Sequence, residues 1–288
     1  MLYSIFMKKS ILTLLIFAVI SSCGPSQHGY FEVPSNWVYS IKQHRDSIYF
    51  STSEKGIFRF DPEKPSVVAP VARYLHLPFR SLVFLPKQGT CLASSYYAGV
   101  FSLTRDTLVP LHWASYPAWA IKLDENENIW LAGDFGIFHQ RADTLQRFCD
   151  IREGHDIAFW GNNVVVAHMK GISIYDKETG KHGRDYAQGM VCWSCTVYDS
   201  LLVAGGIGRC LVISKQGCHE IKFGSANDIL WATALLPHDT LVLATQKGLF
   251  RAHIADSAAT LWGYKNSCVK SLLLDNKNRL WVGTFDHR

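Results

Sequence analysis

Residues 269–284 read Val-Lys-Ser-Leu-Leu-Leu-Asp-Asn-Lys-Asn-Arg-Leu-Trp-Val-Gly-Thr, and this stretch decides the fold. Two apolar runs flank the polar turn Asp275–Asn278, and the second run ends in the small residue Gly283. Short apolar runs joined by a tight polar turn are typical of a β-hairpin. The stretch therefore predicts two paired strands and not a helix.

The second strand of this hairpin recurs along the chain as an apolar segment that ends in a small residue. Seven copies, 35 to 42 residues apart, end at Ser51, Ala93, Ala132, Ala167, Ala204, Ala244 and Gly283. A glycine follows each of the first six copies within six residues: Gly56, Gly99, Gly136, Gly171, Gly208 and Gly248. Because glycine adopts positive φ without steric cost, these positions predict a second tight turn and a third strand.

A period near 40 residues, with four short strands per unit and no amphipathic helix, indicates an all-β, seven-bladed β-propeller over residues 36–288. The last copy stops at residues 283–288 before a further glycine turn, so we expect the last blade to be incomplete. Residues 23–35 are expected to form a tether, and residues 28–35 could supply a ring-closing strand that still leaves this blade one strand short. Either the last blade is thin, or the chain is the front of a longer protein.

Residues 269–284 resemble the two-component-regulator propeller repeat, in which an apolar strand, an Asp and a polar turn precede Leu-Trp-Val/Ile-Gly-Thr. A second good match is residues 118–133, whereas the other five copies are degenerate. In that family the repeats build the extracytoplasmic sensor part of hybrid histidine kinases and related regulators, many of them tied to carbohydrate use. The resemblance implies ligand sensing. This sequence does not show the tyrosine-rich β-sandwich, membrane helix and kinase that usually follow in such sensors.

Residues 1–22 have the features of a bacterial lipoprotein signal peptide. Two lysines precede the apolar stretch 11–20, which has the length of a signal core and is too short to span a bilayer. Ile20-Ser21-Ser22-Cys23 resembles a lipobox, whose cysteine is lipidated and becomes the first mature residue. We therefore expect export, with a lipid anchor at Cys23 that holds the protein to a membrane of the cell envelope, on the periplasmic or cell-surface side. The alternative is an ordinary secretory signal cut near Ser22.

The composition supports a folded domain without a nucleic-acid partner. Hydrophobic residues make up 48% of the chain and charged residues 18%, which is enough apolar material for a large core. The net charge is +5, and it falls by two to +3 without Lys8 and Lys9 of the leader. A charge this small and scattered gives no basic surface for nucleic acid, so we expect no such partner.

The cysteines do not indicate a metal or redox site. Seven cysteines follow Cys23, and an odd number cannot all pair within one chain. Cys192-Trp-Ser-Cys195 is not accompanied by a second such pair or by spaced histidines. We therefore interpret these cysteines as small core residues and expect neither a metal nor a cofactor.

Candidate ligand-binding residues lie where the innermost strand of each blade begins, at the mouth of the channel. Aligning the copies places there Trp37, Arg80 or its neighbour Ser81, Trp119, His155, Trp193, Trp231 and Lys270. Indole rings stack on sugars and cations, and basic side chains favour an acidic or sulfated group. A carbohydrate ligand is therefore expected. Alternatively, these tryptophans plug the channel or pack between blades, as we expect of Trp130 and Trp281 on the second strands.

Three functions stay open: ligand binding or sensing, which we favour, a platform for an envelope protein partner, and hydrolysis or lyase chemistry. A hydrolytic propeller needs carboxylates that converge on the channel. Asp156 and Asp228 form the one such pair, whereas Asp124 and Asp275 are expected to cap turns. No Gly-x-Ser-x-Gly motif occurs. We therefore expect no enzyme activity and assign no catalytic residue.

Overall fold

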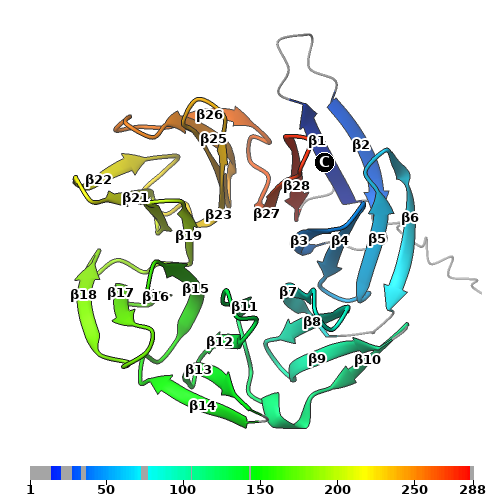
Figure 1. The fold of residues 1–288 in the computed structure, drawn as a ribbon. Coiled ribbons are helices and arrows are strands. Elements are labelled where there is room, and N and C mark those ends of the chain that lie inside the picture. Colours follow the sequence, from blue (N-terminus) through cyan, green and yellow to red (C-terminus); the bar gives the residue numbers. More distant parts are fainter. Residues whose placement is uncertain are drawn as a thin grey trace, which may run out of the picture.

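The chain folds as an all-β propeller in the computed structural model (Figure 1). The residues that the structure describes are 14–20 and 28–33, both by backbone alone, and 37–72, 77–104, 106–142 and 144–285. Within them, seven four-stranded antiparallel sheets surround a central axis. The innermost strands β3, β7, β11, β15, β19, β23 and β27 face that axis (Figure 1). Their starts therefore meet at one mouth of the channel, as the sequence predicts.

Six sheets are each built from four consecutive strands and are called blades one to six. Blade one holds β3 (Val38–His44), β4 (Ser47–Thr52), β5 (Ile57–Asp61) and β6 (Lys64–Ala72). Blade two holds β7 (Phe79–Leu85), β8 (Thr90–Ser95), β9 (Gly99–Thr104) and β10 (Thr107–Pro110), and the 3-10 turn η1 (His112–Ala114) follows it. Blade three holds β11 (Ala120–Leu123), β12 (Ile129–Gly133), β13 (Gly136–Arg141) and β14 (Thr144–Cys149). Blade four holds β15 (Gly154–Trp160), β16 (Asn163–His168), β17 (Gly171–Asp176) and β18 (His182–Tyr186). Blade five holds β19 (Ser194–Tyr198), β20 (Leu201–Gly205), β21 (Arg209–Ser214) and β22 (Gly217–Lys222). Blade six holds β23 (Leu230–Leu236), β24 (Thr240–Thr245), β25 (Gly248–His253) and β26 (Thr260–Gly263).

The remaining sheet, called the closing sheet, joins the two ends of the described chain. It pairs β27 (Val269–Leu274) and β28 (Arg279–Thr284) with β1 (Leu14–Ile20) and β2 (His28–Val33), in the order β2-β1-β28-β27. The expectation of an incomplete last blade is therefore wrong, because β1 pairs with β28 and β2 with β1. The prediction missed β1 because a short apolar run fits a buried strand as well as a signal core. Cys23 lies outside the described residues, so its lipidation stays a prediction.

The core is divided among the spaces between neighbouring sheets. In the described residues, seven buried apolar clusters each join side chains of two adjacent sheets. The cluster between the closing sheet and blade one contains Trp281, whose ring lies 4.9 Å from that of Phe60. Polar contacts reinforce the same junction, because Ser271 Oγ donates to Val38 O at 3.2 Å and Arg279 pairs with Glu63 at 2.8 Å. Side-chain contacts between blade one and the closing sheet therefore close the ring.

Two turns on the far side from the mouth carry an aspartate–tryptophan clasp. The Asp275 carboxylate accepts the backbone N–H groups of Lys277 and Arg279, and its second oxygen accepts Trp281 Nε1–H at 2.9 Å. Asp124 holds Trp130 in the same way in blade three, at 3.2 Å. The structure confirms that both aspartates cap turns and that both tryptophans are buried structural residues.

The glycines of the repeat fulfil the two steric roles expected of them. The six predicted turn glycines all have positive φ, namely Gly56, Gly99, Gly136, Gly171, Gly208 and Gly248. At Gly283 a Cβ would lie 2.3 Å from Ser271 Oγ and 2.8 Å from Val38 Cγ1. A larger residue there would force the closing sheet away from blade one. Among the described residues, no helix is long and apolar enough to cross a membrane.

Candidate ligand site at the channel mouth

One side chain from each sheet reaches the mouth at the start of the innermost strand, and in five of the seven sheets a bulge places it there. The ladder register shifts across Tyr39, Arg80, His155, Trp231 and Lys270, each of which is left as the extra residue of its strand. In blades three and five the corresponding residues, Trp119 and Trp193, immediately precede the strand. A bulge re-aims its extra side chain and ends regular pairing. The fold therefore presents seven side chains around one opening.

Six of the seven residues predicted to bind a ligand line a single cavity of about 520 Å³ in the channel: Arg80, Trp119, His155, Trp193, Trp231 and Lys270. Ser81, named as the alternative to Arg80, also lines it. Trp37 is not among the lining residues. Its ring packs edge-on against Phe285 at 3.9 Å, and Tyr39, two positions later, occupies the bulge of blade one. The alignment missed Tyr39 because hydrophobic patterning does not reveal which residue a bulge leaves unpaired.

The aromatic rings of the mouth contact one another in a continuous series. Trp119 and Trp193 lie 6.2 Å apart between ring centroids, and Trp193 and Trp231 lie 5.3 Å apart. The imidazole of His155 stacks on Trp193 at 4.0 Å with an interplanar angle of 8°. Its Nδ1 lies 2.8 Å from Cys192 O, and because a carbonyl only accepts, Nδ1 carries the proton. Burial lowers the pKa of His155, so the ring is held neutral near pH 7.

Two cations flank this series and lie against its rings. The guanidinium of Arg80 sits between Tyr39 and Trp119, with its carbon 4.7 Å and 4.4 Å from the ring centroids. Lys270 Nζ lies 2.8 Å from the centroid of the Trp231 ring. Burial, followed by the charge of Arg80, lowers the pKa of Lys270 to about 7. Both cations are thus fixed in place by cation–π contact.

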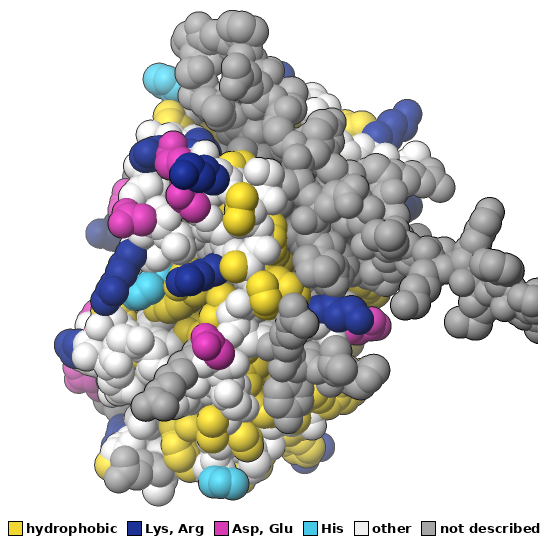
Figure 2. Space-filling view, turned by 90° about the vertical axis from the view of Figure 1, so that its right-hand side faces the viewer, with side chains coloured by type: hydrophobic (Ala, Val, Ile, Leu, Met, Phe, Trp, Pro, Cys, Tyr) yellow, Lys and Arg dark blue, Asp and Glu magenta, His cyan; other side chains and the backbone are white. Residues whose placement is uncertain are grey.

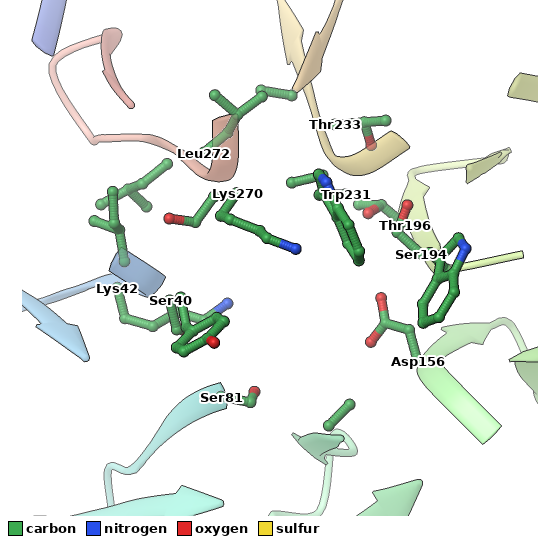
Figure 3. Close-up of a pocket in the computed structure, with 18 of the residues that line it drawn as sticks. Ser40, Lys42, Ser81, Asp156, Ser194, Thr196, Trp231, Thr233, Lys270 and Leu272 are labelled. Atoms are coloured by element: carbon green, nitrogen blue, oxygen red, sulfur yellow. The ribbon is translucent and has the colours of Figure 1, made fainter. Parts of the chain in front are cut away.

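A second set of charged residues lies on the same inner strands, farther from the mouth. Lys122 Nζ pairs with Asp156 Oδ1 at 3.0 Å, and the other oxygen of Asp156 accepts Cys195 N–H at 3.2 Å. Burial and the charge of Lys122 lower the pKa of Lys42 to about 8. Lys42, Asp156 and Lys270 extend from β3, β15 and β27 toward the same open space (Figure 3). The sequence prediction named neither Lys42 nor Lys122, since it considered only the strand starts.

The proposed carboxylate pair does not converge on the channel. Asp156 lines the cavity but is engaged by Lys122 and by the backbone of blade five. Asp228 is fully buried, is not among the lining residues, and accepts the Thr245 hydroxyl at 3.0 Å. Burial raises the pKa of Asp228. The two groups therefore do not form the acid/base arrangement that hydrolysis of a glycosidic bond requires.

The seven cysteines of the described residues are free thiols. Cys192 and Cys195 belong to the apolar cluster between blades four and five, and Cys91, Cys210 and Cys268 are also buried. Cys149 is half-buried and Cys218 is exposed. In the part of the chain that the structure describes, no group of three or more His, Cys, Asp or Glu side chains could hold a metal ion.

Comparisons with known proteins support the propeller and the type of repeat. Residues 263–286 match the family model of the two-component regulator propeller. The WD40 β-propeller domain of Doa1 superimposes with a TM-score of 0.73 at 10% identity, over 88% of this chain and 91% of that one. The extracellular domain of a hybrid two-component system of B. thetaiotaomicron superimposes at 0.70 and 12% identity, over 88% of this chain and 39% of that one.

A second extracellular domain from B. thetaiotaomicron, of a one-component system, superimposes with a TM-score of 0.69 at 16% identity, over 94% of this chain and 42% of that one. This chain therefore spans about two fifths of the length of the two bacterial sensor domains. A search of curated proteins finds no match. The chain thus resembles the extracellular domains of two-component systems in its propeller fold and in its last repeat.

Proposed function

We propose that this chain is the ligand-binding propeller of an exported sensor and that it binds a glycan at the channel mouth. The observation that carries the proposal is a pair of buried donors on lining residues: Trp193 Nε1 and Trp231 Nε1 have no hydrogen-bond partner among the described residues. A buried donor without a partner costs about 1–3 kcal/mol. A ligand hydroxyl that accepts these protons removes that cost only in the bound state, and sugars supply many such acceptors.

The expected location follows from two independent indications. The bacterial propellers to which this chain is similar are extracellular domains of two-component or one-component systems. The lipobox-like Ile20–Cys23 segment provides a membrane anchor at the cell envelope. In this proposal β27 and β28 of the closing sheet complete the ring, and β27 brings Lys270 to the mouth.

The proposal is tested by calorimetric titration of the purified protein with a panel of neutral and acidic oligosaccharides. Trp193→Ala removes an indole donor that has no partner among the described residues, and Trp119→Ala removes a ring that holds Arg80 in place, so each should weaken binding by more than about 1 kcal/mol. Trp262→Ala is the matched control, because Trp262 lies on the outer strand β26, away from the cavity. Absence of binding across the panel, or equal affinities in the three variants, would refute the proposal. No sugar should be cleaved during the titration.

A protein-interaction platform is the second candidate, because apolar side chains are exposed beside the mouth. Tyr97, Phe135 and Met169 are 68%, 54% and 40% exposed. They lie in the turns after β8, β12 and β16, which the antiparallel topology places on the mouth face of blades two to four. If this face docks a protein, Tyr97→Ser combined with Phe135→Ser should abolish a purified envelope complex and leave sugar affinity unchanged.

A further inference from the structure

The channel cavity has an excess of positive charge. Four basic residues line it, Lys42, Arg80, Lys122 and Lys270, whereas Asp156 is the one acidic lining residue. The outer surface differs, since basic and acidic side chains are interspersed on the face shown in Figure 2. A concave site lined by one sign of charge raises the local concentration of the opposite sign.

Three of the four cations have no acidic partner among the described residues. Asp156 pairs with Lys122 at 3.0 Å, whereas Lys42, Arg80 and Lys270 form no salt bridge there. Arg80 Nε is buried and finds no hydrogen-bond partner in the described part of the chain. Glu54, Asp134 and Glu153 lie near the mouth but do not line this cavity, and Asp134 accepts Trp119 Nε1–H and the Tyr96 hydroxyl. The positive charge is thus left for a ligand to neutralise.

The cations are close enough to repel one another, and aromatic contacts hold them there. The charge of Arg80 disfavours the charged form of Lys270, and that of Lys122 disfavours the charged form of Lys42. Cation–π contact with Tyr39, Trp119 and Trp231 fixes Arg80 and Lys270 without neutralising them. An entering anion relieves the repulsion between groups that are already held in place, and such groups lose less freedom on binding.

The same contacts occupy ring faces that a neutral sugar would need for stacking. Arg80 lies over Trp119, His155 is stacked on Trp193, and Lys270 lies over Trp231. Recognition by CH–ring stacking is therefore restricted at each of these indoles. The charged groups remain available to a ligand, and they favour an acceptor that carries negative charge.

We propose that the ligand is an acidic oligosaccharide whose carboxylate or sulfate group binds between Arg80 and Lys270. This inference rests on the proposed glycan binding and specifies its substrate class. The anion accepts hydrogen bonds from the guanidinium and the ammonium group, and neighbouring hydroxyls accept from Trp193 Nε1 and Trp231 Nε1. The deeper Lys42 offers a second positive group to an anionic unit farther along the chain of sugars.

The test uses galacturonic acid and galactose tetrasaccharides, which differ in charge at equal length, together with a sulfated heparin-derived tetrasaccharide and inorganic sulfate. Calorimetry on the full chain should show at least about tenfold tighter binding of one acidic sugar than of the neutral one, the scale of a hydrogen bond to a charged group. Lys270→Gln and Arg80→Gln should abolish this preference. Lys270→Arg, which keeps the charge, should retain it, as should the control Lys215→Gln in the exposed turn after β21.

The outcomes separate this inference from the proposed function. If the neutral sugar binds as tightly as both acidic sugars, or if Lys270→Gln leaves acidic-sugar affinity unchanged, the anionic class is wrong while glycan binding stands. If no sugar binds but sulfate binds the native chain and not Lys270→Gln, the anion site stands and glycan binding fails. Circular dichroism of each variant checks that the fold is intact. If Lys270→Gln unfolds, the anion site is tested instead by comparing the preference for acidic sugar in Lys270→Arg, which should keep it, with that in Arg80→Gln, which should lose it.

Discussion

The clasp at Asp275 provides a direct test of how the ring is closed. The carboxylate accepts four hydrogen bonds, from the backbone N–H groups of Lys277 and Arg279, from Arg279 Nε and from Trp281 Nε1. Its side chain is fully buried, and Arg279 reaches on to Glu63 and to Pro62 O of blade one. Asp275→Ala therefore removes the acceptor of a buried cation and loosens the junction with blade one.

The size of the effect follows from the groups left without a partner. Arg279 keeps its contact with Glu63, whereas Trp281 Nε1–H and the backbone N–H groups of Lys277 and Arg279 lose a buried acceptor, so we expect a cost of about 3–5 kcal/mol. In a domain of this size each kcal/mol lowers Tm by about 2–4 °C, so a fall of roughly 10 °C is expected. The matched variant is Asp124→Ala, because Asp124 makes the same turn and indole contacts without an arginine. Its cost should be smaller, about 2–3 kcal/mol.

Urea and thermal unfolding, followed by circular dichroism, measure both values. Hydrogen bonds outweigh the effect of burial and lower the pKa of Asp275 in the folded state. Its stabilising contribution is therefore present above the ordinary carboxyl pKa and is lost as the pH falls through the lowered one, so the difference between native and variant should shrink near pH 3. A loss below about 1 kcal/mol, or a larger loss in Asp124→Ala than in Asp275→Ala, would refute the reasoning.

Two further predictions concern the mouth and the leader. The pKa of Lys270 is lowered to about 7 and that of Lys42 to about 8, so affinity for an acidic sugar should fall between pH 6 and pH 8.5 as the two lysines lose their protons. Lys270→Arg should lose the part of this fall near pH 7 and keep only the smaller decline near pH 8 that Lys42 causes. Residues 14–20 cannot be both a removed signal core and strand β1. If the lipobox is used, protein from a lipoprotein-processing host should be a lipidated chain that begins at Cys23, and intact-mass analysis measures this. A mature mass that retains residues 14–20 would reject the lipobox and assign them to the closing sheet.

The repeat could be predicted from sequence because its constraints are local. Each turn glycine must adopt positive φ, and each small residue at the end of a second strand lies where sheets crowd, as Gly283 does against Val38 and Ser271. Asp124 and Asp275 precede polar turns, which makes their capping role visible in the sequence as well. These features depend on a few neighbouring residues and therefore leave a pattern in the chain.

The site was predicted less completely because it depends on register and on contacts between distant blades. A one-residue bulge decides that Tyr39 and not Trp37 faces the mouth, and no local pattern distinguishes the two. Lys42 and Lys122 each follow an isoleucine on an inner strand. The alternation of apolar and polar residues predicts that each lysine lies on the polar face of its strand, but it does not predict that these faces line one shared cavity. That Arg80 lies against Trp119 and Lys270 against Trp231 follows only from the closed ring.

The bulge also explains why side chains at the mouth can be substituted without altering the ring. On each innermost strand one residue directly follows the residue at the mouth. In blade four this residue is Asp156, and in the other six sheets it is small: Ser40, Ser81, Ala120, Ser194, Ala232 and Ser271. Several of them bond the next inner strand, as Ser271 does to Val38 O and Ser194 to Leu230 O. The bulged residues have no ladder partner and contact one another around the cavity and not in the apolar clusters between sheets, so aromatic, cationic and imidazole side chains all fit there. Substitutions such as Lys270→Gln should therefore change binding strongly and stability little, whereas Ser271→Leu should reverse this order.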